Sequence, residues 1–493
     1  MNQRIIDTLF LETAAQIAEN IQGQEERDKV LAFTAVSYAE AGDIDGAVEV
    51  SEMIGDSYQR DRVLGLIAAA SVPAGAAQNA DAVLEMIEDD GAYGVGIEEL
   101  AAAYAEAEEF EKAVEIAHRQ SESSPVLSRI ALAYVAHGRE AEALEIVRTL
   151  DYPDLKILIY IEMAAKAVSE KLFPNAIELL DEATGAVEDI DYSAARLDAW
   201  ISIANLYRAC GQEDRAAEIL SRASEVLAKA EDLDKDDYRA KLAIAFGDGR
   251  QFEDADRLME EIDSPYHFAQ ATANVALSHH SAGDTGTARQ LLTEAFEIVR
   301  DEEVYGAQTL AWRETLLDEL ARHHLMTGQF EKSLEIATSL ATPDGRDTTL
   351  KELAVLCVGL GNNGQAFQVL ELIREDPGKV LCEAKLIEAF SKSGQSDLAD
   401  RILSQAASRV SSAEPPYRRA ELALELVPCF VLCQQHEQAA RTLFATLETL
   451  TAIADPYQIG RVLIAVAGYY RDLSLPVGER EKKVLGEISD KLD

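Results

Sequence analysis

Cysteine is scarce in this sequence, and its spacing excludes the usual roles of clustered thiols. The 493 residues contain five cysteines, Cys210, Cys357, Cys382, Cys429 and Cys433. Their number is odd, and they form no C-x-x-C pair and no His-rich metal spacing. This usage argues against a disulfide framework and against a zinc site. Reduced thiols are the simplest interpretation, and we expect a cytoplasmic protein.

Basic residues are also few. Lys and Arg together number 45 against 89 Asp and Glu, which gives a formal net charge of -44. Nucleic acids and anionic lipids are bound through cationic side chains that neutralise phosphates, so we expect no nucleic acid and no membrane among the partners. The charge is spread along the chain, and a hydrophobic content of 48% is too high for disorder. The composition predicts a folded, acidic protein.

Long apolar runs are missing. A helix that crosses a membrane needs about twenty consecutive apolar residues. The nearest candidate, 353–370, carries glycine, asparagine and glutamine in its middle. Asp7 and Glu12 interrupt the N-terminal segment, which therefore does not have the apolar centre of a signal peptide. We expect neither export by such a signal nor a membrane span.

The sequence does contain a repeat. In the segment 200–223, Trp200, Ile203 and Tyr207 precede Gly211, and Ala216 follows it. Apolar spacings of three and four residues on both sides of a glycine are typical of two short amphipathic helices joined by a turn. An alanine five residues after the turn sets the register. A small residue at this position allows the second helix to cross the first closely.

The same small position can be followed along the whole chain. Most intervals are 33 residues, and three of the longer ones are 39 or 40. The positions are Ala47, Ala80, Ala113, Ala143, Ala176, Ala216, Ala255, Ala288, Ser333, Ala366, Ala399 and Ala439. Twelve helical hairpins are predicted, joined by brief linkers that carry Pro or Asp.

The segment around Trp200 resembles the tetratricopeptide repeat (TPR). The match covers Trp200, Ile203, Ala204, Tyr207, Ala216, Leu220 and Ala223. The resemblance extends over roughly residues 29–450, although His279 and His324 stand where the motif has tyrosine. It implies an all-α, right-handed superhelix, a TPR-like solenoid of about twelve hairpins. We expect an N-terminal capping helix at 1–28, the repeat solenoid at 29–456 and C-terminal capping helices at 457–493.

One segment suggests a different fold. Gly359, Gly361 and Gly364 have the spacing G-x-G-x-x-G of a dinucleotide-binding turn, and the acidic Glu383 follows about twenty residues later. In the repeat frame, however, Gly361 lies five residues before Ala366 and is the turn of a hairpin. A parallel strand needs neighbouring strands, and no other segment offers any. We favour the hairpin and expect no cofactor.

Other chemical candidates have structural interpretations. The pairs His279–His280 and His323–His324 could act in metal or acid–base chemistry, but His279 and His324 fall on the packed tyrosine position. Cys429 and Cys433 lie four residues apart on one helical face and are interpreted as small core residues. The sequence contains no serine-hydrolase, zinc-protease, P-loop or calcium-loop motif. We therefore expect no metal site and no enzymatic activity, although catalytic residues scattered over different hairpins would escape a motif search.

The TPR resemblance implies a concave groove lined by the first helix of each hairpin. In the early repeats the inward positions are apolar, as at Ala32 and Val36, and tight packing is favoured there over ligand binding. In the middle repeats they are polar and offer the better place for a specific ligand. The candidate partner-binding residues are Asn205, Arg208, Gln270, His280 and Arg322. Each arginine could hold a partner carboxylate, or only neutralise an acidic neighbour such as Asp198 or Asp318.

Two hypotheses for function follow. The first is a non-enzymatic scaffold or adaptor that binds a partner protein or peptide in the groove. The second is a regulatory sensor that binds a small peptide or metabolite in the polar middle of the solenoid. An unrecognised enzyme is a third alternative, and it would need a deep pocket rich in carboxylates with shifted pKa values.

Overall fold

Every regular element that the structure describes is helical. The computed structural model describes residues 2–120, 122–231, 233–300, 310–374 and 376–492, and no strand occurs among them. Contacts divide the chain into two compact units, which are described separately. Unit 1 comprises Met1–Ala133 and Ile373–Asp493, and unit 2 comprises Tyr134–Leu372. The predicted all-α fold is confirmed.

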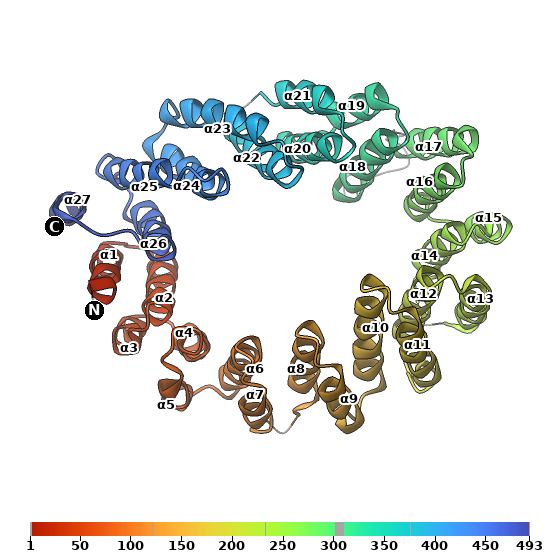
Figure 1. The fold of residues 1–493 in the computed structure, drawn as a ribbon, viewed down its shortest axis with the longest axis horizontal. Helices are drawn as coiled ribbons and strands as arrows, with labels where there is room; N and C mark the ends of the chain where they lie inside the picture. Colours follow the sequence, from red (N-terminus) through yellow and green to blue (C-terminus); the bar gives the residue numbers. More distant parts are fainter. Residues whose placement is uncertain (1, 121, 232, 301–309, 375, 493) are drawn as a thin grey trace. The chain divides into compact units, whose positions relative to one another are not determined.

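Successive helices pair as hairpins (Figure 1), for example α2 with α3 and α16 with α17. The first helices are α2 (Gln24–Glu40), α4 (Ser57–Ser71), α6 (Asp90–Glu106), α8 (Ser124–Ala136), α10 (Pro153–Ser169), α12 (Ser193–Ala209), α14 (Lys235–Asp248), α16 (Pro265–Ser281), α18 (Leu310–Met326), α20 (Pro343–Gly359), α22 (Asp376–Lys392), α24 (Pro416–Leu432) and α26 (Pro456–Asp472). The second helices are α3 (Ile44–Glu52), α5 (Ala80–Leu84), α7 (Phe110–Ala117), α9 (Glu140–Thr149), α11 (Phe173–Val187), α13 (Glu213–Lys229), α15 (Phe252–Glu260), α17 (Thr285–Arg300), α19 (Phe330–Thr338), α21 (Asn363–Leu372), α23 (Ser396–Ser411) and α25 (His436–Leu450). Two further helices, α1 (Asn2–Glu19) and α27 (Glu479–Leu492), stand at the ends, and the 3₁₀ turn Ala77–Asn79 precedes α5.

The small position predicted in each repeat is buried in every hairpin. All twelve residues lie in second helices, eleven have no exposed surface, and Ala216 is 2% exposed. A fully buried alanine at this position lets the two helices of a hairpin approach closely, as the pattern predicted. The register taken from the sequence is therefore correct along the whole chain.

The turn between the two helices uses left-handed backbone. Gly361 has φ of 76°, and Gly42, Gly138, Gly211, Gly283, Gly328 and Gly394 also have positive φ. Glycine adopts this conformation without the steric cost that a Cβ imposes. Gly359 ends α20 and Gly364 lies in α21, so the three glycines close a hairpin. Glu383 lies in α22, fully buried and 3.3 Å from Arg409. The interpretation of this segment as a strand, a glycine turn and a helix is wrong.

Some hairpins place a side chain where the others have glycine. Lys171 has φ of 62° at the turn between α10 and α11. We expect Lys171→Gly to stabilise unit 2 by about 1 kcal/mol, because a non-glycine residue in left-handed backbone costs that much. Gly361→Ala should destabilise it by about the same amount. Denaturant unfolding of the two variants tests both expected changes in stability. An unchanged unfolding midpoint for both variants would contradict the turn geometry.

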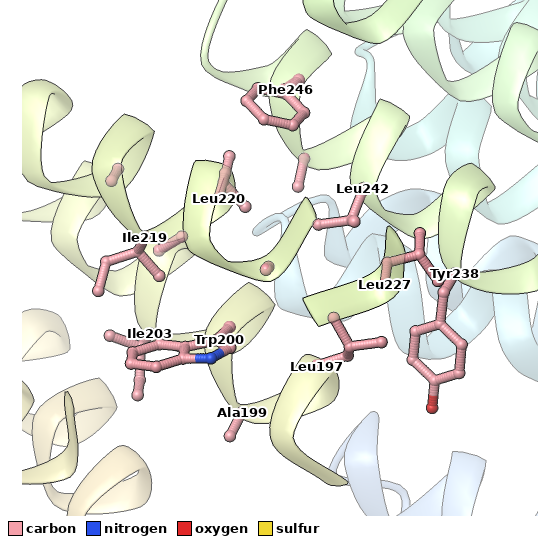
Figure 2. Close-up of a cluster of buried hydrophobic side chains, with 14 of the residues drawn as sticks. Leu197, Ala199, Trp200, Ile203, Ile219, Leu220, Leu227, Tyr238, Leu242 and Phe246 are labelled. Carbon is pink, nitrogen blue, oxygen red and sulfur yellow. The ribbon is translucent and has the colours of Figure 1, made fainter. Parts of the chain in front are cut away.

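The core of unit 2 forms where consecutive hairpins stack. Trp200 and Leu220 have no exposed surface and lie on the two helices of one hairpin (Figure 2). Leu242 and Phe246, from α14, extend the same cluster into the next repeat. Apolar side chains thus fill the space within a hairpin and between neighbours, and the polar faces of the helices remain for solvent or ligands.

Buried carboxylates couple one repeat to the next, a feature that the repeat pattern did not predict. Asp61, in α4, is 2% exposed and accepts hydrogen bonds from the backbone N–H groups of Glu88 (3.0 Å) and Asp89 (2.8 Å), just before α6. The same arrangement joins Asp28 to Gly55 and Asp56, and Asp236 to Asp263 and Ser264. Each carboxylate satisfies N–H groups at the start of the following first helix, which have no partner inside that helix.

Within unit 1, the two ends of the chain pack against each other. Helices α1 and α2 lie beside α26 (Figure 1), and the rings of Phe10 and Tyr470 are 5.1 Å apart between centroids. Helix α27 packs on α25 and α1. The division into caps at 1–28 and 457–493 and a solenoid between them stays a prediction.

Candidate functional site

The candidate site is a row of polar side chains on the first helices of unit 2. Consecutive first helices from α12 to α20 contact each other, and hydrogen bonds and ion pairs link polar side chains into a line across them. We call this line the polar row. Its members are Asp198 on α12, Asp237 and Lys241 on α14, Gln270 and Asn274 on α16, Asp318, Glu319 and Arg322 on α18, and Glu352 on α20.

Ion pairs and hydrogen bonds join α12 to α14. The Lys241 ammonium lies 3.3 Å from Asp198 and 3.0 Å from Asp237. The Tyr238 hydroxyl donates to Asp198 over 3.1 Å. The His267 ring, on α16, lies 4.0 Å from Asp237 and continues the row. One lysine thus faces two carboxylates, so this part of the row carries net negative charge.

A hydrogen bond joins α16 to α18. The side-chain amide of Asn274 donates to Glu319 over 2.6 Å and to the backbone carbonyl of Gln270 over 2.9 Å. The Glu319 side chain is 18% exposed and lies 3.9 Å from His323. Burial raises the pKa of Glu319, although the Asn274 hydrogen bond and the Arg322 charge act against it. The geometry holds this carboxylate in one position on the row.

Arg322 is already engaged with carboxylates of its own chain. Its guanidinium donates to Asp318 over 2.8 Å and lies 3.6 Å from Glu352. Asp318 also accepts from the Thr349 hydroxyl over 2.6 Å, which ties α18 to α20. A partner carboxylate that bound Arg322 would therefore share the guanidinium with Asp318. Of the two roles weighed from the sequence, this contact pattern favours neutralisation.

Arg208 links two repeats. Its guanidinium donates to the backbone carbonyl of Ala245 on α14 over 2.6 Å and to the Asn205 side chain over 3.1 Å. Its side chain is 16% exposed and lies 3.9 Å from Glu213. A cation at the C-terminal end of α14 also interacts favourably with the carbonyl groups there. These contacts favour a structural role for Arg208.

The five predicted residues do not form one cluster. They lie on α12, α16 and α18. Among them, a described hydrogen bond joins Arg208 to Asn205. His280 is half-buried, and its neighbour His279 stacks on Phe252 with ring centroids 3.8 Å apart. The assignment of these five residues to partner binding stays a prediction.

Sequence reasoning missed five members of the row, Asp237, Lys241, Asn274, Glu319 and Glu352. Lys241, Asn274 and Glu319 each lie fourteen residues before the small position of their repeat, and so does Glu352. This repeated offset was the available signal. It went unused because the inward positions were taken from the TPR motif.

Two buried histidines of α18 provide a test of the packing beside the row. Burial, aided by the Arg322 charge, lowers the pKa of His323 to about 4, and burial with the Lys332 charge lowers that of His324 to about 4. Both rings are therefore neutral in the folded protein near neutral pH. Because the unfolded rings take up protons near pH 6.5, stability should fall with pH below that value, by up to about 1.4 kcal/mol per pH unit for each ring.

Thermal unfolding between pH 7 and 5 measures this effect. His324→Tyr places the residue that Tyr207 supplies at the same position of another repeat. The variant should show a shallower loss of stability with falling pH than the wild type, because one of the two protonations is gone. An equal slope for both proteins would contradict the burial of a neutral His324.

The described residues offer little to hold a metal ion. They contain no group of three or more His, Cys, Asp or Glu side chains with that geometry. Burial raises the pKa of Cys357 and of Cys429 to about 11, so both thiols stay protonated at neutral pH. In the same described part of the chain, no helix has the length and apolar character needed to cross a membrane.

A cavity of about 850 Å³ lies apart from the polar row, between α9, α10 and α11. Its apolar lining includes Tyr160 and Met163. The carboxylates around it are Glu140, Glu170, Glu178, Asp181 and Glu182. Its volume lies in the range of small-molecule sites, and its five carboxylates, against the one lining cation Arg148, would favour a cationic ligand.

Comparisons with known proteins return helical repeat structures at low similarity. No protein-family profile and no curated sequence matches the chain. Ton1535 from Thermococcus onnurineus NA1 is 16% identical, with 75% of this chain and 98% of that chain covered and a TM-score of 0.26. One chain of the APC/C heterotetramer Cut9–Hcn1 is 15% identical, with 93% of this chain and 89% of that chain covered and a TM-score of 0.24. The pentatricopeptide repeat protein PPR10 from maize is 14% identical, with 92% and 80% covered and a TM-score of 0.25. At these scores the fold assignment rests on the hairpins of this chain itself.

Proposed function

We propose that this chain is a TPR-like, non-enzymatic scaffold that binds a partner protein or peptide along the polar row. The observation that carries the proposal is the positioning of polar groups across successive helices, above all the Asn274–Glu319 hydrogen bond between α16 and α18. Groups held in place by rigid helices lose little entropy when a ligand binds. A row that crosses several repeats suits an extended segment better than a compact ligand.

The charge of the row supports a partner segment that is cationic or rich in hydrogen-bond donors. Its carboxylates are Asp198, Asp237, Asp318, Glu319 and Glu352, and its cations are Lys241 and Arg322. Both cations are already paired within the chain. The carboxylates of the row therefore outnumber its cations. A basic segment would be electrostatically complementary to the row. The overall charge of -44 disfavours nucleic acid as the partner.

Charge reversal on the row tests the proposal. We expect the double variant Asp198→Lys/Glu352→Lys, used as bait on a lysate, to capture the partner at least tenfold less strongly, a loss of about 1.4 kcal/mol. The matched control is Glu253→Lys/Glu294→Lys, which changes exposed positions on the second helices α15 and α17 by the same charge. Equal capture by both variants would place the binding surface elsewhere.

A small-ligand sensor is the second candidate, and the 850 Å³ cavity beside α10 favours it. Under this alternative the ligand is a small cation held by the acidic rim. Thermal shift measurements distinguish the two functions, because a ligand that binds the folded state raises the melting temperature. A shift with a polyamine, abolished by Glu178→Gln/Glu182→Gln and accompanied by no captured protein, would favour the sensor.

A further inference from the structure

The two ends of the chain together form one repeat. We propose that this split repeat is a self-association surface, in which α26 of one copy of the chain receives α1 either from the same copy or from a second copy. The proposal concerns unit 1 alone and does not depend on the partner-binding row.

The sequence of α1 has the register of a second helix. In α25 and the turn after it, Leu443, Thr446, Leu450 and Ile453 are buried at offsets of 3, 7 and 10. The buried residues Leu11, Ala14, Ala18 and Ile21 repeat these offsets in α1 and the turn after it. From Leu443 to the start of α26 there are thirteen residues, and from Leu11 to the start of α2 there are also thirteen. Helix α1 therefore precedes α2 as a second helix precedes the next hairpin.

Helix α1 also occupies the place of a second helix. It packs along α26, as the second helix of a hairpin packs on its first helix, while α27 contacts α25 and α1. The Lys491 ammonium of α27 donates to the backbone carbonyls of Thr451 (2.9 Å) and Ile453 (2.7 Å), after the end of α25. The helix that follows α26 in sequence thus lies elsewhere, and the helix from the other end of the chain takes its position.

The contact between α26 and α2 repeats a contact between covalently continuous repeats. Arg471, the second-last residue of α26, donates to the carbonyl of Ser37, the fourth-last residue of α2, over 3.4 Å. Arg208, the second-last residue of α12, donates in the same way to Ala245, the fourth-last residue of α14. Arg471 also pairs with Glu40 over 2.8 Å. Helix α26 therefore relates to α2 as α12 relates to α14.

A second copy can make the same contacts because no short linker joins the two sides. In an ordinary hairpin a tight turn forces both helices to come from one copy. In the split repeat the whole array separates α26 from α1, so the surfaces belong to a head (α1 and α2) and a tail (α26). Within one copy the high effective concentration favours closure. When copies fold together at high concentration, a head can bind the tail of another copy, as in domain exchange.

Glycine at the junction provides a matched pair of variants. A Cβ on Gly460 would lie 2.9 Å from a methyl group of Val30 on α2, whereas a Cβ on Gly468, in the same helix, would meet nothing within 4 Å. Gly460→Val should therefore disrupt the head–tail contact, and Gly468→Val should leave it intact. Both changes add the same side chain to α26.

The test unfolds the full-length chain and refolds it at low and at hundredfold higher concentration, with mass measured by light scattering. We expect dimers or larger species after concentrated refolding of the wild type and of Gly468→Val, and at least a fivefold smaller fraction for Gly460→Val. Monomers alone at both concentrations, or an equal fraction in Gly460→Val, would overturn the proposal.

A second variant tests the same contact without depending on the folding of Gly460→Val. Arg471→Glu places two acids together at the junction and should also reduce the exchanged fraction, while Glu40→Arg in the same chain restores opposite charges and should recover it. Hydrogen exchange should be faster in α1 and α26 of Arg471→Glu and should return to the wild-type rate in the double variant. Faster exchange that Glu40→Arg does not correct would count against the head–tail contact.

Discussion

Gly65→Val should destabilise unit 1 by about 3 kcal/mol, at the upper end of the usual cost of overpacking. A Cβ on Gly65 in α4 would lie 2.9 Å from the Cα atom of Gly96 in α6. The obstacle is backbone, which cannot rotate away as a flexible side chain can. Relief would require the two first helices to separate, and this would expose the buried Leu64 and Ile97.

Gly185→Val is the control for this prediction. Gly185 lies in α11, and a Cβ there would meet nothing within 4 Å. Both variants add valine to a helix, so the cost of valine itself is the same in the two. The unfolding free energies measured with denaturant should therefore differ by most of the loss expected for Gly65→Val. If the two unfolding free energies differ by less than about 1 kcal/mol, the lower limit for overpacking, α4 and α6 do not approach each other as closely as described.

Asp61→Ala should cost about 3 kcal/mol, because it removes two hydrogen bonds between a buried carboxylate and backbone N–H groups. The N–H groups of Glu88 and Asp89 would lose their partner at the start of α6. Burial acts to raise the pKa of Asp61, but the hydrogen bonds from Asp89 and Glu88 and the charge of Arg60 outweigh it and lower the pKa. The carboxylate therefore stabilises the fold above its unfolded pKa, and this contribution is lost as the pH falls through the lowered folded value.

The control for this prediction is Asp256→Ala, which removes an exposed carboxylate from α15. Its effect on the unfolding free energy should stay within about 0.5 kcal/mol, as for most surface substitutions. Hydrogen exchange should show the damage of Asp61→Ala at the start of α6 and fade within one or two repeats, because repeats couple mainly to their neighbours. A loss spread evenly over unit 1 would contradict this coupling.

Local periodicity was enough to predict the hairpins. The small position and the turn five residues before it are both fixed by contacts within one hairpin, so Ala216 and Gly211 could be placed from spacing alone. The same reasoning resolved the glycine motif at 359–364. The coupling carboxylates were harder to predict, because Asp61 acts on residues 27 and 28 positions away, across a linker. The shared Arg-Asp pairs at 27–28 and 60–61 were a signal that periodicity did not use.

The contacts within the candidate site could not be predicted from the sequence, because they depend on which neighbours pair. The TPR motif assigned Arg322 and Arg208 to inward positions, but the sequence could not show that Asp318 and the Ala245 carbonyl already engage them. Nor could it show that α1 would pack along α26, because that contact joins opposite ends of the chain. Pairing across repeats depends on side-chain reach and helix stacking, which spacing alone does not determine.

Hydrogen exchange of the wild-type chain, with and without its captured partner, tests the binding proposal most directly. The account predicts that the partner slows exchange in the first helices α12 to α20, which carry the polar row, and leaves the second helices α13 to α19 unchanged. Slower exchange confined to the second helices, or to unit 1, would contradict it.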